Sequence, residues 1–258
     1  SDSVGGVAVR LGLSSIRGIG LELAQSIEVL RKGCRAVTSG CEPEGVTQTG
    51  EGGFGSLEEL VRAVPALTLP QLEAMATAGV FERSLGLERR EALWAVGAAV
   101  QSRPGRLEGI VVGQQAPHLP GMAPLEVAVA DLWATGVAPN GHPTQFLRDA
   151  LAQQGVVTAA GLWDCEPRTK VLVAGVVTHR QRPMTAQGVT FMNLEDETGL
   201  INIVVSKGCW ARYRKIARSA PALLIRGRLE RSEGVINISA EELTPLAVAA
   251  SNPSRDFR

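Results

Sequence analysis

A turn near the amino terminus has residues that could bind an anion. Gly18, Ile19 and Gly20 follow Arg17, and apolar residues on both sides of the turn have helical spacing. Glycines permit a tight turn and bring backbone N–H groups, with the start of the second helix, close to an anion. The pattern predicts a helix-hairpin-helix that binds a duplex DNA phosphate without reading bases. The alternative is an ordinary helical hairpin whose glycines only cap and turn.

A second group of candidate binding residues is basic and lies late in the chain. Residues 169–246 contain 11 Lys and Arg against 7 Asp and Glu, a surplus of 4, whereas residues 1–168 contain 13 against 18, a deficit of 5. Arginines in this segment could hold phosphates, and one aromatic side chain could stack on a base. These residues are Arg180, Arg182, Phe191, Arg226, Arg228 and Arg231. Solvated surface arginines are the alternative interpretation.

Residues for metal-dependent catalysis or zinc binding do not form a recognisable pattern. The six aspartates are scattered, without an Asp-x-Asp pair, and Cys34 and Cys41 lack the second pair of Cys or His that a zinc site needs. The acidic run 195–197 is expected to be a solvated hairpin tip. No Ser, Cys or acidic residue is placed by sequence beside His118, His142 or His179. Since His142 precedes a proline, a helix-entry role is predicted for it.

Five runs rich in β-branched and aromatic residues predict the strands that position the basic group. They cover residues 170–178, 188–194, 200–205, 222–229 and 235–240. The segment between the third and fourth strands has helical spacing, with Trp210, Tyr213 and Ala217 on one side. Three strands, a helix and two strands is the order of the five-stranded OB-fold barrel, which often binds nucleic acid or oligosaccharide.

The barrel suggests where the arginines lie. An OB-fold ligand usually crosses strands two and three, between the loop joining strands one and two and the loop joining strands four and five. The first loop is predicted to carry Arg180 and Arg182, and the second Arg231. Arg226 and Arg228 alternate with apolar residues on strand four, which predicts that both face outward. We therefore expect the arginines to converge on one rim.

The first part of the chain predicts a helical domain. Amphipathic helices are expected over 56–64, 68–78 and 88–100, with Ser56 and Thr68 as N-caps, and Phe81 and Trp94 are assigned to its core. The predicted class is thus α+β and multi-domain, an all-α helix-hairpin-helix domain followed by an all-β barrel. The expected boundaries are 1–102 with a loop at 31–55, a linker with connecting helices at 103–168, the barrel at 169–246 and a tail at 247–258.

The overall composition describes an ordinary globular chain. It has 258 residues, a formal net charge of zero, 45% hydrophobic residues and 4 Cys. Neither an apolar run of membrane length nor a signal-peptide pattern is present in the sequence, so no membrane contact is expected. With few cysteines, this predicts a reducing, cytoplasmic setting.

Three stretches resemble the C-terminal part of bacterial C-family DNA polymerases, which are related to the polymerase III α subunit. They are VRLGLSSIRGIG at 9–20, LWATGVAPNGHP at 132–143 and the barrel run from VVTHRQRP to LINIVV at 176–205. The barrel run, with REALW at 90–94 and SRDFR at 254–258, is similar to the error-prone, damage-inducible ImuC branch of actinobacteria.

This resemblance implies a DNA polymerase, a transferase of DNA replication and repair, whose PHP domain and Mg²⁺-binding palm are not in the chain. No cofactor is therefore expected here, and no catalysis by the fragment alone. A clamp-binding peptide is not found between residues 103 and 125, which fits a branch that reaches the clamp through the adaptor ImuB.

The expected function is DNA binding in support of SOS mutagenesis and translesion synthesis. The helical part would hold duplex DNA, and the barrel would hold single-stranded template or a partner. One alternative is an interaction module that binds ImuB or RecA without touching DNA. A second alternative is a stand-alone module like the barrel of a tRNA-binding protein, although the hairpin domain argues against it.

Overall fold

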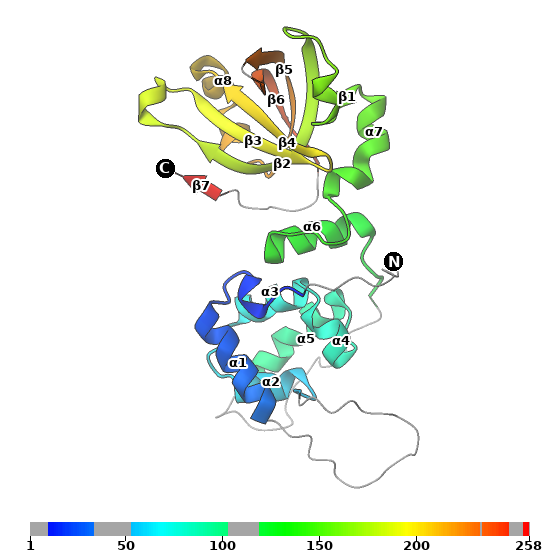
Figure 1. Cartoon of the computed structure of the whole chain (residues 1–258). Coiled ribbons are helices and arrows are strands. Elements are labelled where there is room, and N and C mark those ends of the chain that lie inside the picture. The colour runs from blue at the N-terminus through cyan, green and yellow to red at the C-terminus, as the bar shows by residue number, and fades with distance from the viewer. Residues whose placement is uncertain (1–9, 34–52, 103–118, 233, 248–254, 258) are drawn as a thin grey trace. The chain divides into compact units, whose positions relative to one another are not determined.

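The computed structural model describes residues 10–33, 53–102, 119–232 and 234–247, and the backbone of 255–257. Residues 34–52 of the predicted loop with its two cysteines, residues 103–118 of the linker with His118, and residues 248–254 and 258 of the tail lie outside these residues. Contacts divide the chain into two units, Ser1–Met122 with Ala134–Gly136, and Ala123–Trp133 with Val137–Arg258. The first is helical and the second contains a barrel (Figure 1), which confirms the α+β class.

Five strands form the barrel, in the order that the sequence predicts. They are β2 (Lys170–Gln181), β3 (Thr190–Asp196), β4 (Gly199–Val205), β5 (Ala222–Ser232) and β6 (Val235–Pro245). Neighbouring strands follow the order β2-β3-β4-β6-β5, and β5 pairs again with β2. This closure, with helix α8 (Lys207–Ser219) between β4 and β5, confirms the OB-fold.

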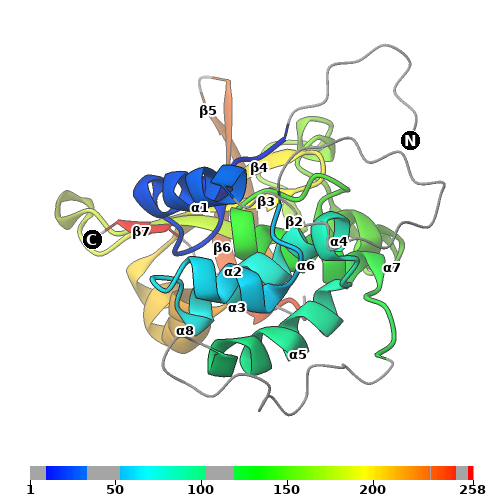
Figure 2. The same ribbon diagram turned by 90° about the horizontal axis from the view of Figure 1, so that it is seen from below.

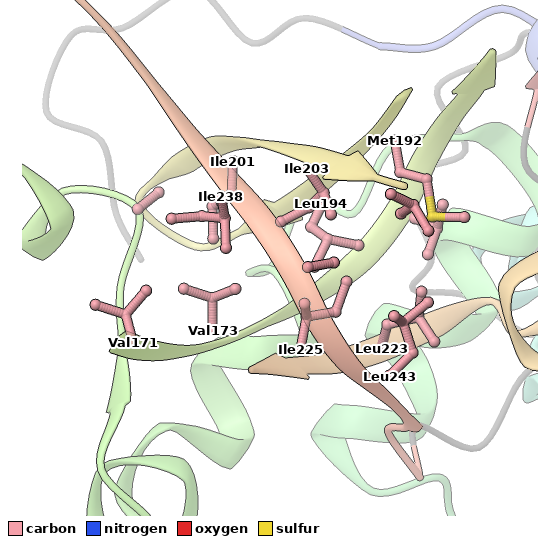
Figure 3. Close-up of a cluster of buried hydrophobic side chains, with 14 of the residues drawn as sticks. Val171, Val173, Met192, Leu194, Ile201, Ile203, Leu223, Ile225, Ile238 and Leu243 are labelled. Atoms are coloured by element: carbon pink, nitrogen blue, oxygen red, sulfur yellow. The ribbon is translucent and has the colours of Figure 1, made fainter. Parts of the chain in front are cut away.

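The barrel core is built from alternate residues of all five strands. Val173, Leu194, Ile203, Ile225 and Ile238 are at most 1% exposed, and Figure 3 shows such side chains pointing into one interior. Because successive residues of a strand point to opposite faces, one alternation places apolar residues inside and polar residues outside. Full burial of each such side chain contributes roughly 1.5–3 kcal/mol. The outer face is thereby left for ligands.

Helix α8 lies against the barrel through one face. Ser206 caps it by accepting a hydrogen bond from the Cys209 N–H at 3.2 Å. Trp210, Tyr213 and Ala217 pack against the barrel core, as the helical spacing predicts. The backbone at Tyr213 departs from helical geometry, so the helix is kinked there.

Short elements before and after the barrel join the same unit. They are α6 (Pro124–Thr135), most of which lies in this unit, η3 (Pro143–Leu147), α7 (Arg148–Gln153), β1 (Val156–Val157), η4 (Gly161–Trp163), η5 (Met184–Ala186) and β7 (Arg255–Phe257). Both β1 and β7 pair with β2 in parallel. Residues 137–168, predicted as a connection, therefore belong to the barrel unit. In the described residues no helix is long and apolar enough to cross a membrane.

The helical unit consists of short helices with local stop and start signals. Its elements are η1 (Leu13–Ser15), α1 (Leu21–Gly33), α2 (Leu57–Ala63), α3 (Leu69–Thr77), α4 (Val80–Leu85), α5 (Arg89–Ala99) and η2 (Val100–Ser102). Figure 2 shows α2, α3 and α5 next to one another, and α2 and α3 both contact α5. Ser56 caps α2 through the Glu59 N–H, and Thr68 forms a capping box with Gln71, which confirms both predicted caps.

The prediction of a buried Trp94 is wrong. Phe81 is 3% exposed, as expected, but Trp94 is 52% exposed on α5. The buried face of α5 is formed by small residues, among them Ala92, Ala95 and Ala99, which recur at helical spacing. Trp94 therefore lies outside the face that packs in the core.

Candidate nucleic-acid interface

The outer face of β3 and β4 offers stacking and hydrogen-bonding groups side by side. Phe191 is 41% exposed and lies opposite Val204, while the next outward pair is Asn193 opposite Asn202. The Asn193 amide donates to the Asn202 side-chain oxygen at 3.4 Å, and the Asn202 amide donates to a β6 carbonyl at 3.2 Å. An aromatic ring can stack on a base, and amides of fixed orientation beside it can form hydrogen bonds with base edges.

Neighbouring strands extend this face in two parallel rows. The registers align His179, Asn193, Asn202 and Asn237 in one row, and Gln181, Phe191, Val204 and Ser239 in the next. Neither row contains an acidic residue. Both can therefore accommodate a polyanion without charge repulsion. We refer to these two rows as the OB face.

A guanidinium–indole pair lies beyond each end of the OB face. The guanidinium carbon of Arg182 lies 5.4 Å from the centroid of the Trp210 ring, and that of Arg231 lies 5.7 Å from the Trp163 ring. Arg231 also donates to the backbone oxygens of Trp163 at 2.7 Å and of Cys165 at 3.2 Å. Such cation–π contacts hold an arginine in place while leaving other N–H donors available.

The two pairs lie at opposite ends of the strands and not on one rim. Arg182 follows the end of β2, beside the start of β3, because Gln181 pairs with Phe191. Arg231 pairs with Ile236, near the start of β4. The sequence analysis missed both tryptophans as partners. In the sequence, these partners could have been recognised as aromatic residues next to predicted elements. Trp163 lies shortly before the first strand of the barrel, and Trp210 lies in the first turn of α8.

Arg180 points into the barrel, although the sequence analysis assigned it to a loop that contacts DNA. Its side chain is 7% exposed, and its guanidinium donates to the Ala217 carbonyl at 2.8 Å and to the Ala220 carbonyl. These carbonyls close the C-terminal end of α8, where cations are favoured. The reason is a β-bulge between Val177 and His179, which reverses the alternation and sets Arg180 opposite the buried Met192.

Arg226 and Arg228 are exposed on β5, as predicted, but β5 is not next to β3 or β4. Arg228 pairs with Ser239 of β6 on one side and with Lys170 of β2 on the other. Arg228 therefore extends the row of Phe191 by one strand, whereas Arg226 lies opposite Glu242, outside both rows. The assignment of either side chain to a DNA site stays a prediction.

The predicted phosphate-binding turn begins with a shorter helix than expected. Only the single 3-10 turn η1 precedes it, and Gly18 has a φ of +75°, which favours glycine. The Ile19 N–H donates to the Ile16 carbonyl at 3.0 Å, and Ile19 is buried. Within the described residues, the N–H groups of Gly18 and Gly20 form no hydrogen bond, and both glycines and Arg17 are exposed. Two of the three predicted donors are thus available.

The acidic hairpin between β3 and β4 is not a solvated turn, which corrects the sequence prediction. Asp196 is 3% exposed, and its carboxylate accepts hydrogen bonds from the backbone N–H groups of Ala159, Thr198 and Gly199 at 2.7–3.0 Å. Glu197 accepts two hydrogen bonds from the Arg148 guanidinium and one from the Thr144 hydroxyl at 2.6 Å. The hairpin is thus fixed by residues that precede the barrel.

Arg148 and Glu197 hold each other ionised. Burial opposes ionisation of Glu197, but hydrogen bonds from Arg148 and Thr144 and the Arg148 charge lower its pKa to about 2. His142 caps η3 by accepting the Thr144 N–H, and burial lowers its pKa. This confirms a helix-entry role for His142. Among the described residues no group of three or more His, Cys, Asp or Glu is placed to hold a metal ion.

The chain is similar to known proteins over its barrel and over most of its length. The family model for the tRNA anti-codon type of OB-fold nucleic acid binding domain matches residues 171–246. Error-prone DNA polymerases of Mycolicibacterium paratuberculosis and Nocardia farcinica are 49% and 46% identical to the chain over 98% of its length. The chain spans 21% of the length of each. Asparaginyl-tRNA synthetase from Pyrococcus horikoshii matches 38% of this chain and 24% of its own, at 20% identity and a TM-score of 0.33.

The matches to the polymerases run through the helical unit as well as the barrel, since they cover almost the whole chain. The chain is therefore homologous to about one fifth of the length of error-prone DNA polymerases, and this fifth includes an OB-fold nucleic acid binding domain.

Proposed function

We propose that this chain is a non-catalytic, DNA-binding part of an error-prone DNA polymerase, and that its barrel holds single-stranded DNA across the OB face. The observation that carries the proposal is the half-exposed Phe191 in one of two neighbouring rows that contain no acidic residue. Exposed aromatic rings of OB-fold barrels stack on bases, and each stacked base contributes about 1–3 kcal/mol. The family model for nucleic acid binding covers this same face.

Each group of the OB face has a distinct task in this proposal. Phe191 stacks on one base, and Val204 beside it widens the apolar platform. Asn193 and Asn202 offer donors and acceptors to base edges without demanding one sequence, since amides can bond to several bases. Arg182, held by Trp210, contacts a phosphate as the strand leaves the face.

The helical unit is proposed to bind duplex DNA by its phosphates. The free N–H groups of Gly18 and Gly20 and the start of α1 converge on an exposed turn. Partial positive charge at a helix start and aligned N–H groups suit a phosphate oxygen. Arg17 adds a formal charge beside them. Such contacts position DNA and carry no sequence information.

In the parent enzyme these two contacts would hold primer-template DNA during damage-induced translesion synthesis. The chain itself would not transfer nucleotides, because its six aspartates include no Asp-x-Asp pair and do not fit a pair of Mg²⁺ ions. Primer extension by the purified chain with Mg²⁺ or Mn²⁺ tests this. Any incorporation of nucleotides would refute it.

The barrel proposal is tested by fluorescence anisotropy with single-stranded, duplex and primer-template DNA at several salt concentrations. Phe191→Leu keeps an apolar side chain but removes the stacking ring, so it should weaken single-strand binding about tenfold. Trp94→Leu is the matched control, since it also replaces an exposed aromatic residue with leucine, in the helical unit. Equal affinity of Phe191→Leu and the unchanged protein would refute stacking on this face.

The duplex proposal is tested by Gly20→Val. A Cβ at Gly20 has no atom within 4 Å and no positive φ to oppose it, so the variant should fold. Its side chain would block the approach of a phosphate and weaken duplex binding while leaving single-strand binding unchanged. Gly97→Val, at another glycine with open space, is the control. Unchanged duplex affinity in folded Gly20→Val would exclude this turn as the duplex site.

Protein binding is the competing function for the barrel. Met184 is fully exposed in the loop between β2 and β3, and Leu200 is 60% exposed at the other end of the strands. Exposed apolar side chains of this kind suit a protein surface, and the adaptor ImuB or RecA would be the partner. If Phe191→Leu lowers binding to ImuB or RecA and not to DNA, the interaction module replaces the DNA-binding barrel.

A further inference from the structure

The solvent side of α8 carries charge that the OB face does not use. The 13 residues of α8 include five basic and no acidic side chains, and all five basic residues are exposed. They are Lys207, Arg212, Arg214, Lys215 and Arg218. Among the described residues no carboxylate forms an ion pair with any of them. This side of the helix is therefore an uncompensated cationic surface.

Three of these residues form a line along the helix. Arg214 and Arg218 are four residues apart, which brings their side chains to the same side of the helix. Lys207 precedes Arg214 by seven residues, about two turns, and lies before the kink at Tyr213. At 1.5 Å per residue, the line extends for about 16 Å. Trp210 and Ala217, on the side of α8 next to this line, pack against the barrel core, so the orientation of the helix and of the line is fixed. We call these three residues the α8 stripe.

The α8 stripe begins where the OB face ends. Helix α8 starts directly after Val205, which pairs with Thr190 at the start of β3, next to Phe191. A Cβ placed on Gly188 would lie 3.5 Å from the Lys207 side chain and 3.6 Å from the Arg182 guanidinium. Since Arg182 also contacts Trp210, it bridges the loop after β2 and the first turn of α8.

The charges at the two ends of β3 and β4 favour a bound strand that continues toward α8 over one that continues toward the β3–β4 hairpin. The far end of β3 and β4 carries Glu195 and the Asp196–Glu197 pair, held by Arg148. A phosphate backbone that continued in that direction would approach three carboxylates and two guanidinium groups, those of Arg148 and Arg231, with a net charge of −1. In the direction of α8 it would meet Arg182 and the basic residues of the stripe, so the electrostatic field favours α8.

We infer that the α8 stripe is a second binding site, for the sugar-phosphate backbone of a nucleic-acid strand that leaves the OB face past Phe191. The site holds phosphates without reading bases, because lysines and arginines on a convex helix reach charge and not base edges. This inference rests on the proposed function of the OB face, which binds the adjoining nucleotides of the same nucleic-acid strand. Oligonucleotides that only cover the OB face do not reach it.

Oligo(dT) of two lengths separates the two sites. A single OB-fold barrel covers about 4–16 nucleotides, so an oligomer of about 8 serves for the OB face and one of about 20 for both sites. The test variant is Arg214→Gln with Arg218→Gln, and the matched variant, Arg31→Gln with Arg83→Gln, removes the same charge from the helical unit. All four side chains are exposed, and far-UV circular dichroism checks that both variants fold.

The α8 variant should bind the long oligomer about fivefold to tenfold more weakly at about 0.1 M salt, with a salt slope reduced by about 0.7 per lost contact. Its affinity for the short oligomer, and that of the helical-unit variant for both, should stay within about twofold of the unchanged protein.

The outcomes distinguish this site from the OB face. If the unchanged protein binds the short oligomer, and the α8 variant binds the long oligomer as tightly as the unchanged protein does, the α8 site is refuted. The proposed function of the OB face is then unaffected. An equal loss for both lengths, or an equal loss in the helical-unit variant, also overturns the α8 site, because the effect is then not specific to a strand that extends along α8. If the unchanged protein binds neither oligomer, the OB face fails, and the α8 site fails with it.

Discussion

The two ends of the β3–β4 ribbon carry charge in opposite ways. At the hairpin end, Asp196 and Glu197 are enclosed by Arg148, Thr144 and backbone N–H groups. At the other end, the basic residues of α8 face solvent without carboxylate partners among the described residues. Charge that is paired inside the fold stabilises it, and charge that is left unpaired in solvent adds little stability but remains available to a ligand.

Replacing Arg148 should give the largest loss of stability. Arg148→Met removes the cation that pairs with Glu197 and Asp196 and leaves two poorly solvated carboxylates. Breaking such a pair costs about 2–4 kcal/mol, measured as the free energy of unfolding in urea. Arg214→Met, which removes an arginine from the solvent side of α8, is the control. A loss below about 0.5 kcal/mol for Arg148→Met would show that the two ends do not differ in this way.

Acid should weaken the hairpin end by a smaller amount. The folded-state pKa of Glu197 is about 2, below its ordinary value of 4.5. Because this pKa is lowered in the folded state, ionised Glu197 stabilises the fold above pH 4.5. The stabilisation is lost progressively as the pH falls toward 2. Urea midpoints measured across this range should fall for the unchanged protein. They should fall less for Glu197→Gln, and parallel curves would contradict a role of this ionisation in stability.

Replacing Arg180 should reduce stability by about 1–2 kcal/mol and leave DNA binding intact. Arg180→Met leaves the Ala217 and Ala220 carbonyls without these donors at the end of α8. Because the side chain is buried, the affinity of the folded variant for single-stranded DNA should equal that of the unchanged protein. A loss of affinity without a loss of stability would restore Arg180 as a DNA contact.

Neutralising the α8 stripe should have the smallest effect on stability. Lys207→Gln with Arg214→Gln and Arg218→Gln should change the free energy of unfolding by less than about 0.5 kcal/mol, because exposed charges without partners contribute little. Thermal melting at low and high salt measures this. A large loss of stability would mean that the fold needs the charges of the stripe. The two ends of the ribbon would then not differ in the way described above.

Periodicity predicted the barrel well because strand alternation is a local property. The five strands, the amphipathic α8 and the N-caps at Ser56 and Thr68 all depend on residues close in sequence. In the helical unit the prediction for Trp94 was wrong, because Trp94 lies outside the side of α5 that is buried. The alanines of α5 already marked the buried side.

The candidate site was predictable in its residue types but not in its partners. A single bulge before His179 turns Arg180 inward, and no residue pattern marks that bulge in advance. Likewise, Asp196 looked solvated because its partners Arg148 and Ala159 lie far back in the chain. Long-range contacts of this kind appear only once the fold is known.

Strand β2 has four strand partners, and this determines how the barrel opens and forms. It pairs with β1, β3, β5 and β7, and the pairing of Lys170 with Arg228 closes the barrel across a long stretch of sequence. Closing so distant a pair costs loop entropy before any contact is gained, so this step should limit the folding rate. Amide protons in the middle of β2 should accordingly exchange with solvent only through global unfolding, and more slowly than those of the β3–β4 hairpin.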